Sequence, residues 1–220
     1  MNKSLTEIIN NRKSIRAYLD KPVDNKLIKE MLKKASQAPS GGNLQPWKIF
    51  VINSSSMNKF LNFQKNWKGR EDPPYPIYPE KLKEPYRTSR YEVGEEMYSL
   101  IGIKRDDKTG RLNQMLKNFE FFGAPAGLFC FVDKQMGLPQ WSDLGMFLQT
   151  FMLLAADESL GTCAQESWSL KQNCVKSFLN VSDDYLLFCG MAIGYADKNN
   201  KVNELRTSRR PIDDWAKFIK

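Results

Sequence analysis

The sequence predicts a mixed α/β or α+β fold, in which a β-sheet packs against a dominant core of helices. Amphipathic helical patterns open the chain, and short apolar runs typical of strands then alternate with further helical patterns. No G-x-G-x-x-G pattern follows the first apolar run, and the sequence contains no G-x-x-x-x-G-K phosphate loop. These two observations argue against a Rossmann domain and a P-loop fold.

The length favours one domain over residues 1–220, because 220 residues are many for one small domain and few for two. Hydrophobic residues make up 41% and charged residues 26%, as in ordinary soluble globular proteins. The first ten residues lack the apolar stretch of a signal peptide, and no apolar run reaches the ~20 residues that cross a bilayer. We therefore expect a cytoplasmic protein that is not attached to a membrane.

Two helices are expected at the start of the chain. Residues 4–11 form the first, because Ser4 and Glu7 have the spacing of a capping box. The second begins after Asp24, which is a suitable N-cap, and its apolar residues recur at helical spacing. This helix must end before Pro39.

The next part of the chain is predicted to be a loop, a strand and a long excursion. Residues 40–43 are small and polar, as in loops with unusual backbone angles, and residues 47–53 have the pattern of a strand. Residues 66–90 carry five prolines among three tyrosines, so no regular element is expected there. Such a segment is either a lid over a site or a surface wrap that packs its tyrosines.

The remaining elements alternate. The long apolar helix should be buried in its own subunit or in an interface, and Gly161 is the expected residue at its C-terminal end. In chain order the sequence predicts helices at about 90–102 and 106–119, a strand at 126–133, the apolar helix at 141–161, an amphipathic helix at 168–179 and a strand at 185–196.

Histidine is absent, which removes several classes of catalytic mechanism. No Ser-His-Asp or Cys-His nucleophile, no histidine base and no H-E-x-x-H zinc site can form. An enzyme with this sequence would use carboxylates, lysine or tyrosine, or a cofactor. The four cysteines form no C-x-x-C pair, so we expect buried thiols in a reducing compartment and no metal site.

The net charge of +8 suits an anionic partner, either a small molecule or a nucleic acid. Arg12, Lys13 and Arg16 lie together near the start of the chain, and Arg209 lies near its end. Arginine binds phosphate oxygens in a bidentate manner, and Ser14 adds a hydroxyl donor. From spacing alone, scattered surface charges are the favoured interpretation of these residues.

The motif R-K-S-I-R-A-Y and the later A-P-S-G-G-N-L-Q-P-W-K-I-F-V-I resemble the nitroreductase family of flavin-dependent enzymes. The segments F-F-G-A-P-A-G-L-F, C-A-Q-E-S, L-L-F-C-G-M-A-I-G-Y-A-D and L-R-T-S-R-R-P-I-D-D-W resemble the same family in the same order. The resemblance covers essentially the whole chain. Within the family, the chain looks most like the branch of nitrobenzoate and nitroarene reductases.

The resemblance implies an α+β nitroreductase-like fold, with a central, mostly antiparallel sheet flanked by helices in a domain-swapped homodimer. It also implies an FMN site. The first motif would hold the phosphate, ribityl chain and pyrimidine edge, and the small loop would reach the flavin from the partner subunit. The C-A-Q-E-S segment would follow the N5 edge, and the C-terminal arginines would bind the phosphate. In that order, the implied residues are Arg12, Lys13, Ser14 and Arg16; Pro39, Ser40, Gly41 and Asn43; Ala164, Gln165, Glu166 and Ser167; and Arg206 and Arg209.

The implied activity is a ping-pong reaction, in which NADPH or NADH reduces the flavin and a nitroaromatic or quinone-like acceptor then reoxidises it. Among the implied residues, Arg16 is our candidate for the cation at the N1–C2=O edge, where negative charge develops on reduction. Two positions depart from common family patterns. Ser167 stands where many members carry glycine, and Thr207 stands where some carry lysine.

Two other functions remain open from the sequence. The same fold and cofactor could support a different reaction, such as reductive dehalogenation or the breakdown of the flavin itself. A basic nucleic-acid-binding protein is the more distant alternative, because the charge permits it while the lysines are dispersed and no known binding motif is present.

Overall fold

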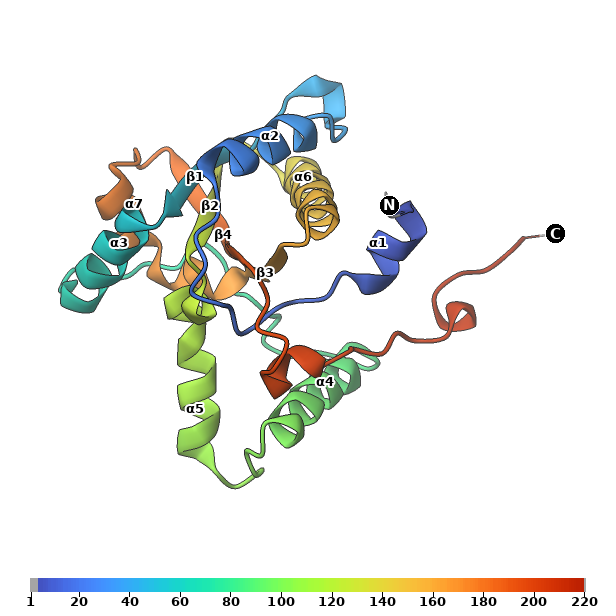
Figure 1. The fold of residues 1–220 in the computed structure, drawn as a ribbon. Helices are drawn as coiled ribbons and strands as arrows, with labels where there is room; N and C mark the ends of the chain where they lie inside the picture. Colours follow the sequence, from blue (N-terminus) through green and yellow to red (C-terminus); the bar gives the residue numbers. More distant parts are fainter. Residues whose placement is uncertain (1–3, 220) are drawn as a thin grey trace.

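A four-stranded antiparallel sheet lies at the centre of the computed structural model, which describes residues 4–219 (Figure 1). The strand order is β1-β2-β4-β3, so β1 and β3 form the two edges. The strands are β1 (Lys48–Asn53), β2 (Ala126–Asp133), β3 (Gly161–Gln165) and β4 (Tyr185–Gly194). The expected antiparallel sheet with flanking helices is confirmed.

Helices cover both faces of this sheet. On one face, α2 (Asn25–Ala35) and α6 (Leu138–Asp157) pack over one cluster of buried apolar residues. On the other face, α3 (Ser55–Asn66), α7 (Gln172–Leu179) and a 3-10 segment (Lys117–Gly123) pack over a second cluster. Removing both apolar surfaces from water is the main force that holds these layers together.

The central strand β2 is buried on both faces, which explains its nearly continuous apolar sequence. Successive side chains of a strand point to opposite faces. Leu128 and Cys130 therefore belong to the cluster under α6, and Phe129 and Phe131 belong to the cluster under α3.

The second cluster is dominated by aromatic rings around Trp168, whose side chain is fully buried. Its ring centroid lies 4.7 Å from that of Phe121 and 5.3 Å from those of Phe60 and Phe129. A Cβ atom at Gly190 would lie 2.3 Å from this ring, so only glycine fits beneath it in β4. The indole is thus held from all sides.

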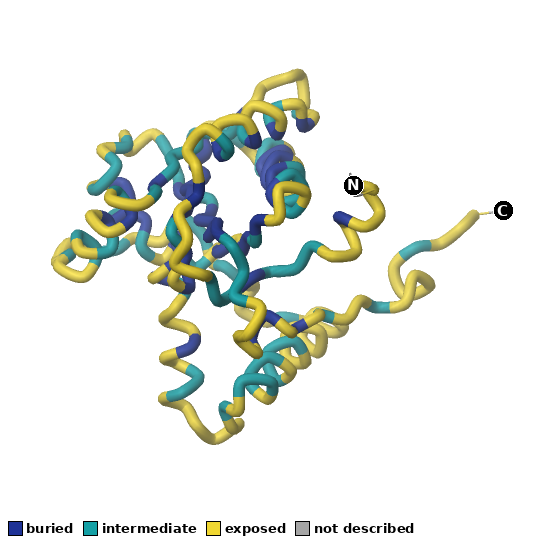
Figure 2. The backbone as a smooth tube through the Cα atoms, viewed as in Figure 1, coloured by how far each residue is buried: buried dark blue, intermediate teal, exposed yellow. Residues whose placement is uncertain are grey.

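Several segments project from these layers (Figures 1 and 2). The N-terminal helix α1 (Leu5–Asn11) buries only Ile8, and α4 (Tyr86–Leu100) buries no residue. Helix α5 (Lys108–Leu116) descends from the sheet to meet α4 at an open corner. The C-terminal tail leaves the body after Leu205 as an exposed arm.

The local signals in the sequence placed most elements correctly. The Ser4–Glu7 capping box is present, and the Asp24 side chain accepts a hydrogen bond from the backbone N–H of Lys26 at 2.8 Å. The strand predicted at 126–133 has these bounds in the structure. The four cysteines are buried and free, as expected.

Some predictions were wrong. Gly161 does not end the long helix but begins β3, and a Cβ atom there would lie 2.6 Å from the Ile15 side chain. The helix predicted over 168–179 is a 3-10 segment (Glu166–Lys171) followed by α7. The excursion lacks regular structure only as far as Pro85, because α4 begins at Tyr86. None of the described helices is long and apolar enough to span a bilayer.

Candidate functional site

A cavity of about 410 Å³ lies where the N-terminal segment, α6 and the C-terminal segment meet. Six residues implied by the family resemblance line this cavity, although they come from opposite ends of the chain. None of its lining residues is acidic. They are Ile9, Asn10, Arg12, Lys13, Ser14, Arg16, Gln149, Leu205, Arg206, Thr207 and Arg209.

Strand β3 positions the N-terminal part of the cavity. Ser14 forms a parallel bridge with Thr162, and the Ile15 N–H donates to the Thr162 carbonyl at 3.0 Å. A few residues later, the Leu19 N–H donates to the carbonyl of Tyr195 at 2.9 Å. The segment 12–18, which we call the basic motif, therefore lies beside the edge strand β3 and passes the end of β4. These backbone hydrogen bonds fix it on the sheet.

The C-terminal part of the cavity follows a short 3-10 turn (Lys201–Glu204). Leu205 is buried at the end of this turn, and the chain then presents Arg206, Thr207 and Arg209 to the cavity. Arg206 donates to the backbone carbonyl of Asn10, which ties the tail to α1. Arg209 bonds only to its own segment, through the Thr207 hydroxyl at 2.7 Å and two nearby carbonyls, within the described chain.

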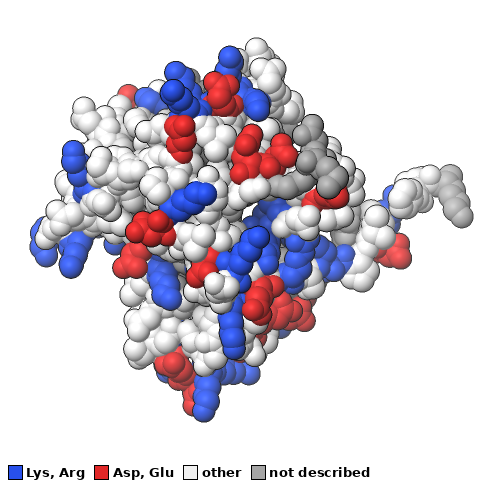
Figure 3. All heavy atoms as spheres, in the orientation of Figure 1, with Lys and Arg blue, Asp and Glu red and all other residues white. Residues whose placement is uncertain are grey.

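Like charges are concentrated at the cavity. The pKa of Arg12 is lowered, first because burial disfavours its charge and then because Arg209 and Arg206 lie close to it. Figure 3 shows blue side chains gathered in this region between the N-terminal segment and the tail. Cations held together without a neighbouring carboxylate repel one another, so an anion bound here would be strongly stabilised.

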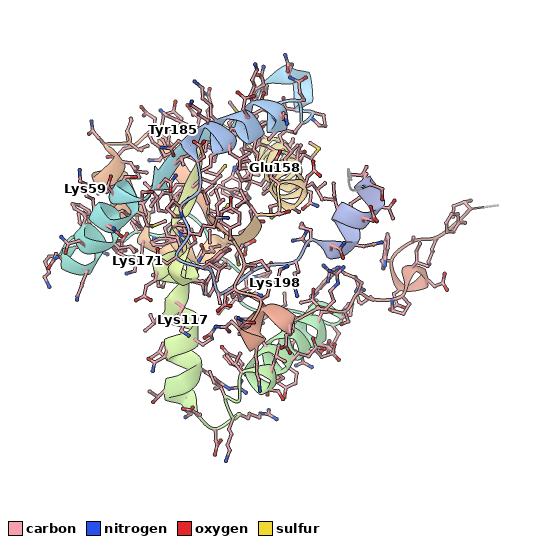
Figure 4. All side chains as sticks on the ribbon, in the orientation of Figure 1. Lys59, Lys117, Glu158, Lys171, Tyr185 and Lys198 are labelled. Carbon is pink, nitrogen blue, oxygen red and sulfur yellow. The ribbon has the colours of Figure 1, made fainter. Side chains whose placement is uncertain are left out.

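Four lysines outside the cavity lie apart from one another. Figure 4 labels Lys59, Lys117, Lys171 and Lys198 on separate parts of the molecule. Lys59 lies on α3, and Lys117 follows the end of α5. These lysines therefore do not form a continuous stripe in this view.

The segment from Ala164 to Ser167 lies just beyond the bridge to the basic motif. Ala164 is exposed and pairs with Met191, which belongs to the cluster under α6, so Ala164 faces the α6 side of the sheet. Gln165 points the other way and donates to the carbonyl of Asn118 at 2.7 Å. Glu166 is exposed, yet partial desolvation still raises the pKa of its carboxyl group.

Two oxygens of this segment are buried without a hydrogen-bond partner in the described chain, the Gln165 Oε1 and the Ser167 Oγ. Buried polar atoms are usually paired, so such atoms often mark a place where another group binds. The Ser167 hydroxyl, at one of the positions that depart from the family pattern, is thus free to bond a ligand.

The small loop, in contrast, does not reach the cavity of its own chain. The Gly41 N–H donates to the buried carboxylate of Asp143 on α6 at 3.2 Å. Asp143 lies six residues before the cavity residue Gln149, or about 9 Å along the helix axis. Pro39, Ser40, Gly41 and Asn43 are all absent from the cavity lining.

The first half of the proline-rich excursion is fixed on the body of the protein. The Glu71 carboxylate accepts the backbone N–H groups of Asn173 and Cys174, at 2.8 and 3.2 Å, at the start of α7. The Tyr75 hydroxyl donates to the Phe188 carbonyl, and its ring packs edge-on against Trp141 at 5.2 Å. This half wraps the surface and packs its tyrosine.

Tyr75 also lies close to the segment 164–167. Its pKa is raised, mainly by burial, and the nearby Glu166 carboxyl contributes to this shift. No motif singled out Tyr75, Gln149, Asn10 or Asn203 in the sequence. For Tyr75, the tyrosine-rich composition of the excursion was the only available signal. No sequence signal pointed to Gln149, Asn10 or Asn203.

The chemistry of the cavity fits the phosphate end of a flavin nucleotide. It offers five cationic side chains, the Ser14 hydroxyl and no carboxylate, which suits a phosphate dianion. Ile9 and Leu205 add apolar surface. In β3, which continues from the cavity, Ala164 is exposed, and the buried Ser167 hydroxyl that has no partner in the described chain follows the end of the strand.

Comparison with known proteins identifies relatives over nearly the whole chain. The family model described as "Nitroreductase family" matches residues 9–195. A 4-nitrobenzoate reductase of Pseudomonas putida is 36% identical over 96% of this chain and 94% of its own length. A nitrobenzene nitroreductase of Ectopseudomonas oleovorans is 31% identical, with coverage of 98% and 96%.

A solved structure shares the fold closely. The FMN- and NADPH-dependent nitroreductase NfnB from Sphigopyxis sp. strain HMH superposes with a TM-score of 0.94 at 38% identity. The alignment covers 99% of this chain and all of that one. The family match, the near-complete relatives and the common fold agree with one another, and the chain therefore belongs to the nitroreductase family.

Proposed function

We propose that this protein is an FMN-dependent oxidoreductase that passes electrons from NADPH or NADH to nitroaromatic or quinone-like acceptors. One observation carries the proposal: the basic residues of both chain ends line one cavity without any carboxylate. The relatives named as reductases of 4-nitrobenzoate and nitrobenzene support nitroaromatic acceptors. The protein would act in the cytoplasm, as one domain over residues 1–220.

The cationic side chains have distinct roles in this proposal. Arg12, Arg206 and Arg209 bind the phosphate together with the Ser14 hydroxyl, and Lys13 completes its neutralisation. Arg16 supplies a permanent cation at the pyrimidine edge, where negative charge develops on reduction. Such a charge favours the reduced state without needing a proton.

The segment from Ala164 to Ser167 orients the N5 edge of the ring. Its small, exposed Ala164 allows close approach, while Gln165 is anchored to Asn118 and keeps the strand end in place. Bound FMN supplies the group that accepts hydride from the nicotinamide and passes electrons to the acceptor. The absence of histidine is no obstacle to this chemistry.

Reduction in the absence of oxygen tests the proposal directly. We expect the purified protein, after incubation with FMN and removal of free flavin, to show the visible bands of bound oxidised flavin. Adding NADPH or NADH should bleach these bands, and a nitroaromatic such as 4-nitrobenzoate should restore them. A protein that stays colourless after incubation with FMN would overturn the proposal.

We further propose that the active form is a domain-swapped homodimer in which Pro39, Ser40, Gly41 and Asn43 complete the partner's flavin site. In one chain the loop is held away from the cavity, by Asp143. The exposed part of α6, including Met146, and the apolar tail residues Trp215 and Phe218 remain uncovered. Such apolar surface favours association with a second copy.

Mixed dimers test this shared site. Chains with Arg12→Ala have a defective cavity, and chains with Asn43→Ala have a defective loop. Dimers of either variant alone should therefore bind FMN poorly. Refolding equal amounts of the two variants together should restore tight binding at about one flavin per four chains, since about half of the dimers are mixed and one of the two sites in a mixed dimer is intact. A molecular mass of a single 25.4 kDa chain in light scattering, or no recovery on mixing, would contradict the shared site.

A further inference from the structure

Asn203 is a buried amide at the junction of the two basic segments, with 5% of its surface exposed. Its Oδ1 accepts the backbone N–H of Arg16 at 2.8 Å. Its Nδ2 donates to the carbonyls of Ala17 at 2.8 Å and Asp197 at 2.9 Å. The backbone carbonyl of Asn203 itself accepts a hydrogen bond from the Lys13 ammonium.

These bonds use both donors of the side-chain amide and its acceptor. They join three stretches of backbone that are distant in sequence: the basic motif, the turn after β4 and the start of the C-terminal tail. Because the amide is buried, each lost partner would leave a polar group unpaired. No other asparagine side chain forms as many of the hydrogen bonds described between the N-terminal and C-terminal segments.

The position of Asn203 matters because the arginines of the two chain ends repel one another across the cavity. Arg12 lies close to Arg206 and Arg209, and all three carry the same charge. Without a bound anion, their repulsion pushes the two segments apart. Asn203 lies three residues before Arg206 and bonds to both sides of this junction, so it offsets that repulsion.

We propose that Asn203 is a positioning residue that holds the two basic segments at a fixed separation and so preforms the phosphate site. The proposal rests on the proposed FMN site but goes beyond it, because Asn203 is absent from the cavity lining. Preforming a site lowers the ordering cost of binding, so loss of the amide should weaken binding of the phosphate in particular.

Comparing FMN with riboflavin, which lacks the phosphate, isolates this effect. We expect Asn203→Ala to raise the FMN dissociation constant by about tenfold or more, since charge-assisted contacts to the phosphate would be misaligned. The riboflavin constant should change much less, so the preference for FMN over riboflavin falls. Quenching of flavin fluorescence measures both constants.

Val202→Ala is the matched control for loss of stability. Val202 is 3% exposed, belongs to the same 3-10 turn and makes no side-chain contact through hydrogen bonds. This variant should lower the melting temperature while leaving the FMN preference unchanged. A merely structural role for Asn203 predicts that both variants behave in this way.

Asn203→Asp keeps the size of the side chain and provides a second test if the alanine variant does not fold. One carboxylate oxygen can still accept the backbone N–H of Arg16. The other oxygen would replace the donor Nδ2 and face the carbonyls of Ala17 and Asp197, so the FMN preference should fall at neutral pH. Burial raises the pKa of such a carboxyl, and the protonated acid can donate to one carbonyl. Lowering the pH should therefore recover part of the preference, relative to the unaltered protein at the same pH.

The outcomes distinguish the positioning role of Asn203 from the proposed FMN site. A reduced FMN preference in either Asn203 variant, with the Val202→Ala preference intact, supports the positioning role. An unchanged preference in folded Asn203 variants overturns it, while the FMN site stands. An unaltered protein that binds riboflavin as tightly as FMN, or binds neither, overturns the phosphate site and with it the inference.

Discussion

Arg12→Ala is expected to strip FMN from the protein without destabilising the fold. A charged hydrogen bond to a phosphate contributes about 1.5–3 kcal/mol, which corresponds to roughly a 10- to 100-fold rise in the dissociation constant. The flavin-free variant should melt at the same temperature as the unaltered protein or higher, because Arg12 is repelled by Arg209 and Arg206. Fluorescence titration with FMN and thermal melting of the flavin-free protein measure the two effects.

Arg87→Ala is the control for the loss of one positive charge. Arg87 is an exposed residue of α4 whose ion pair with Glu84 lies at the surface, and such pairs contribute little. Its FMN affinity should match that of the unaltered protein. If Arg12→Ala retained full affinity for FMN, or unfolded in the absence of flavin, the assignment of Arg12 to the phosphate would be wrong.

Trp168→Ala is expected to cause the largest loss of stability, about 3–5 kcal/mol, as is typical when a buried tryptophan is truncated to alanine. The ring packs against Phe60, Phe121 and Phe129 in the cluster under α3. It also directly follows Ser167, so its loss should loosen the segment proposed to orient the flavin. Urea denaturation, followed by circular dichroism, measures the change in the free energy of unfolding.

Trp168→Phe separates packing from hydrogen bonding at this position. The Trp168 Nε1 is buried without a partner in the described chain, so phenylalanine removes an unpaired donor while it keeps most of the apolar contact. This variant should lose much less stability than Trp168→Ala. Equal losses in the two variants would show that the indole contributes through something other than its packed surface.

The strongest local patterns in the sequence predicted their elements well. The capping box of α1 and the apolar run of β2 depend on neighbouring residues, and the structure has both where they were expected. Helix α3 and strand β3 received no prediction. Strand β3 is only five residues long and has no clear alternation, and its pairing with β4 spans the whole α7 region.

The error at Gly161 has a specific physical cause. Glycine at the end of an apolar helix usually marks a left-handed cap. Here Ser159 adopts the positive φ, and Gly161 is needed because the Ile15 side chain occupies the space of a Cβ atom. The reason for the glycine therefore lies in a residue almost 150 positions away, which no local pattern records.

The sequence by itself determined the kinds of local structure, the absence of histidine chemistry and the motifs that resemble the nitroreductase family. It also contained the basic residues at both chain ends, but it could not distinguish a site from scattered charges. Only the tertiary structure placed Arg12 beside Arg206 and Arg209 and revealed Asn203 between the segments. The physical reason is that the Asn203 bond to Arg16 joins residues 187 positions apart, and contacts of that range depend on how the layers pack.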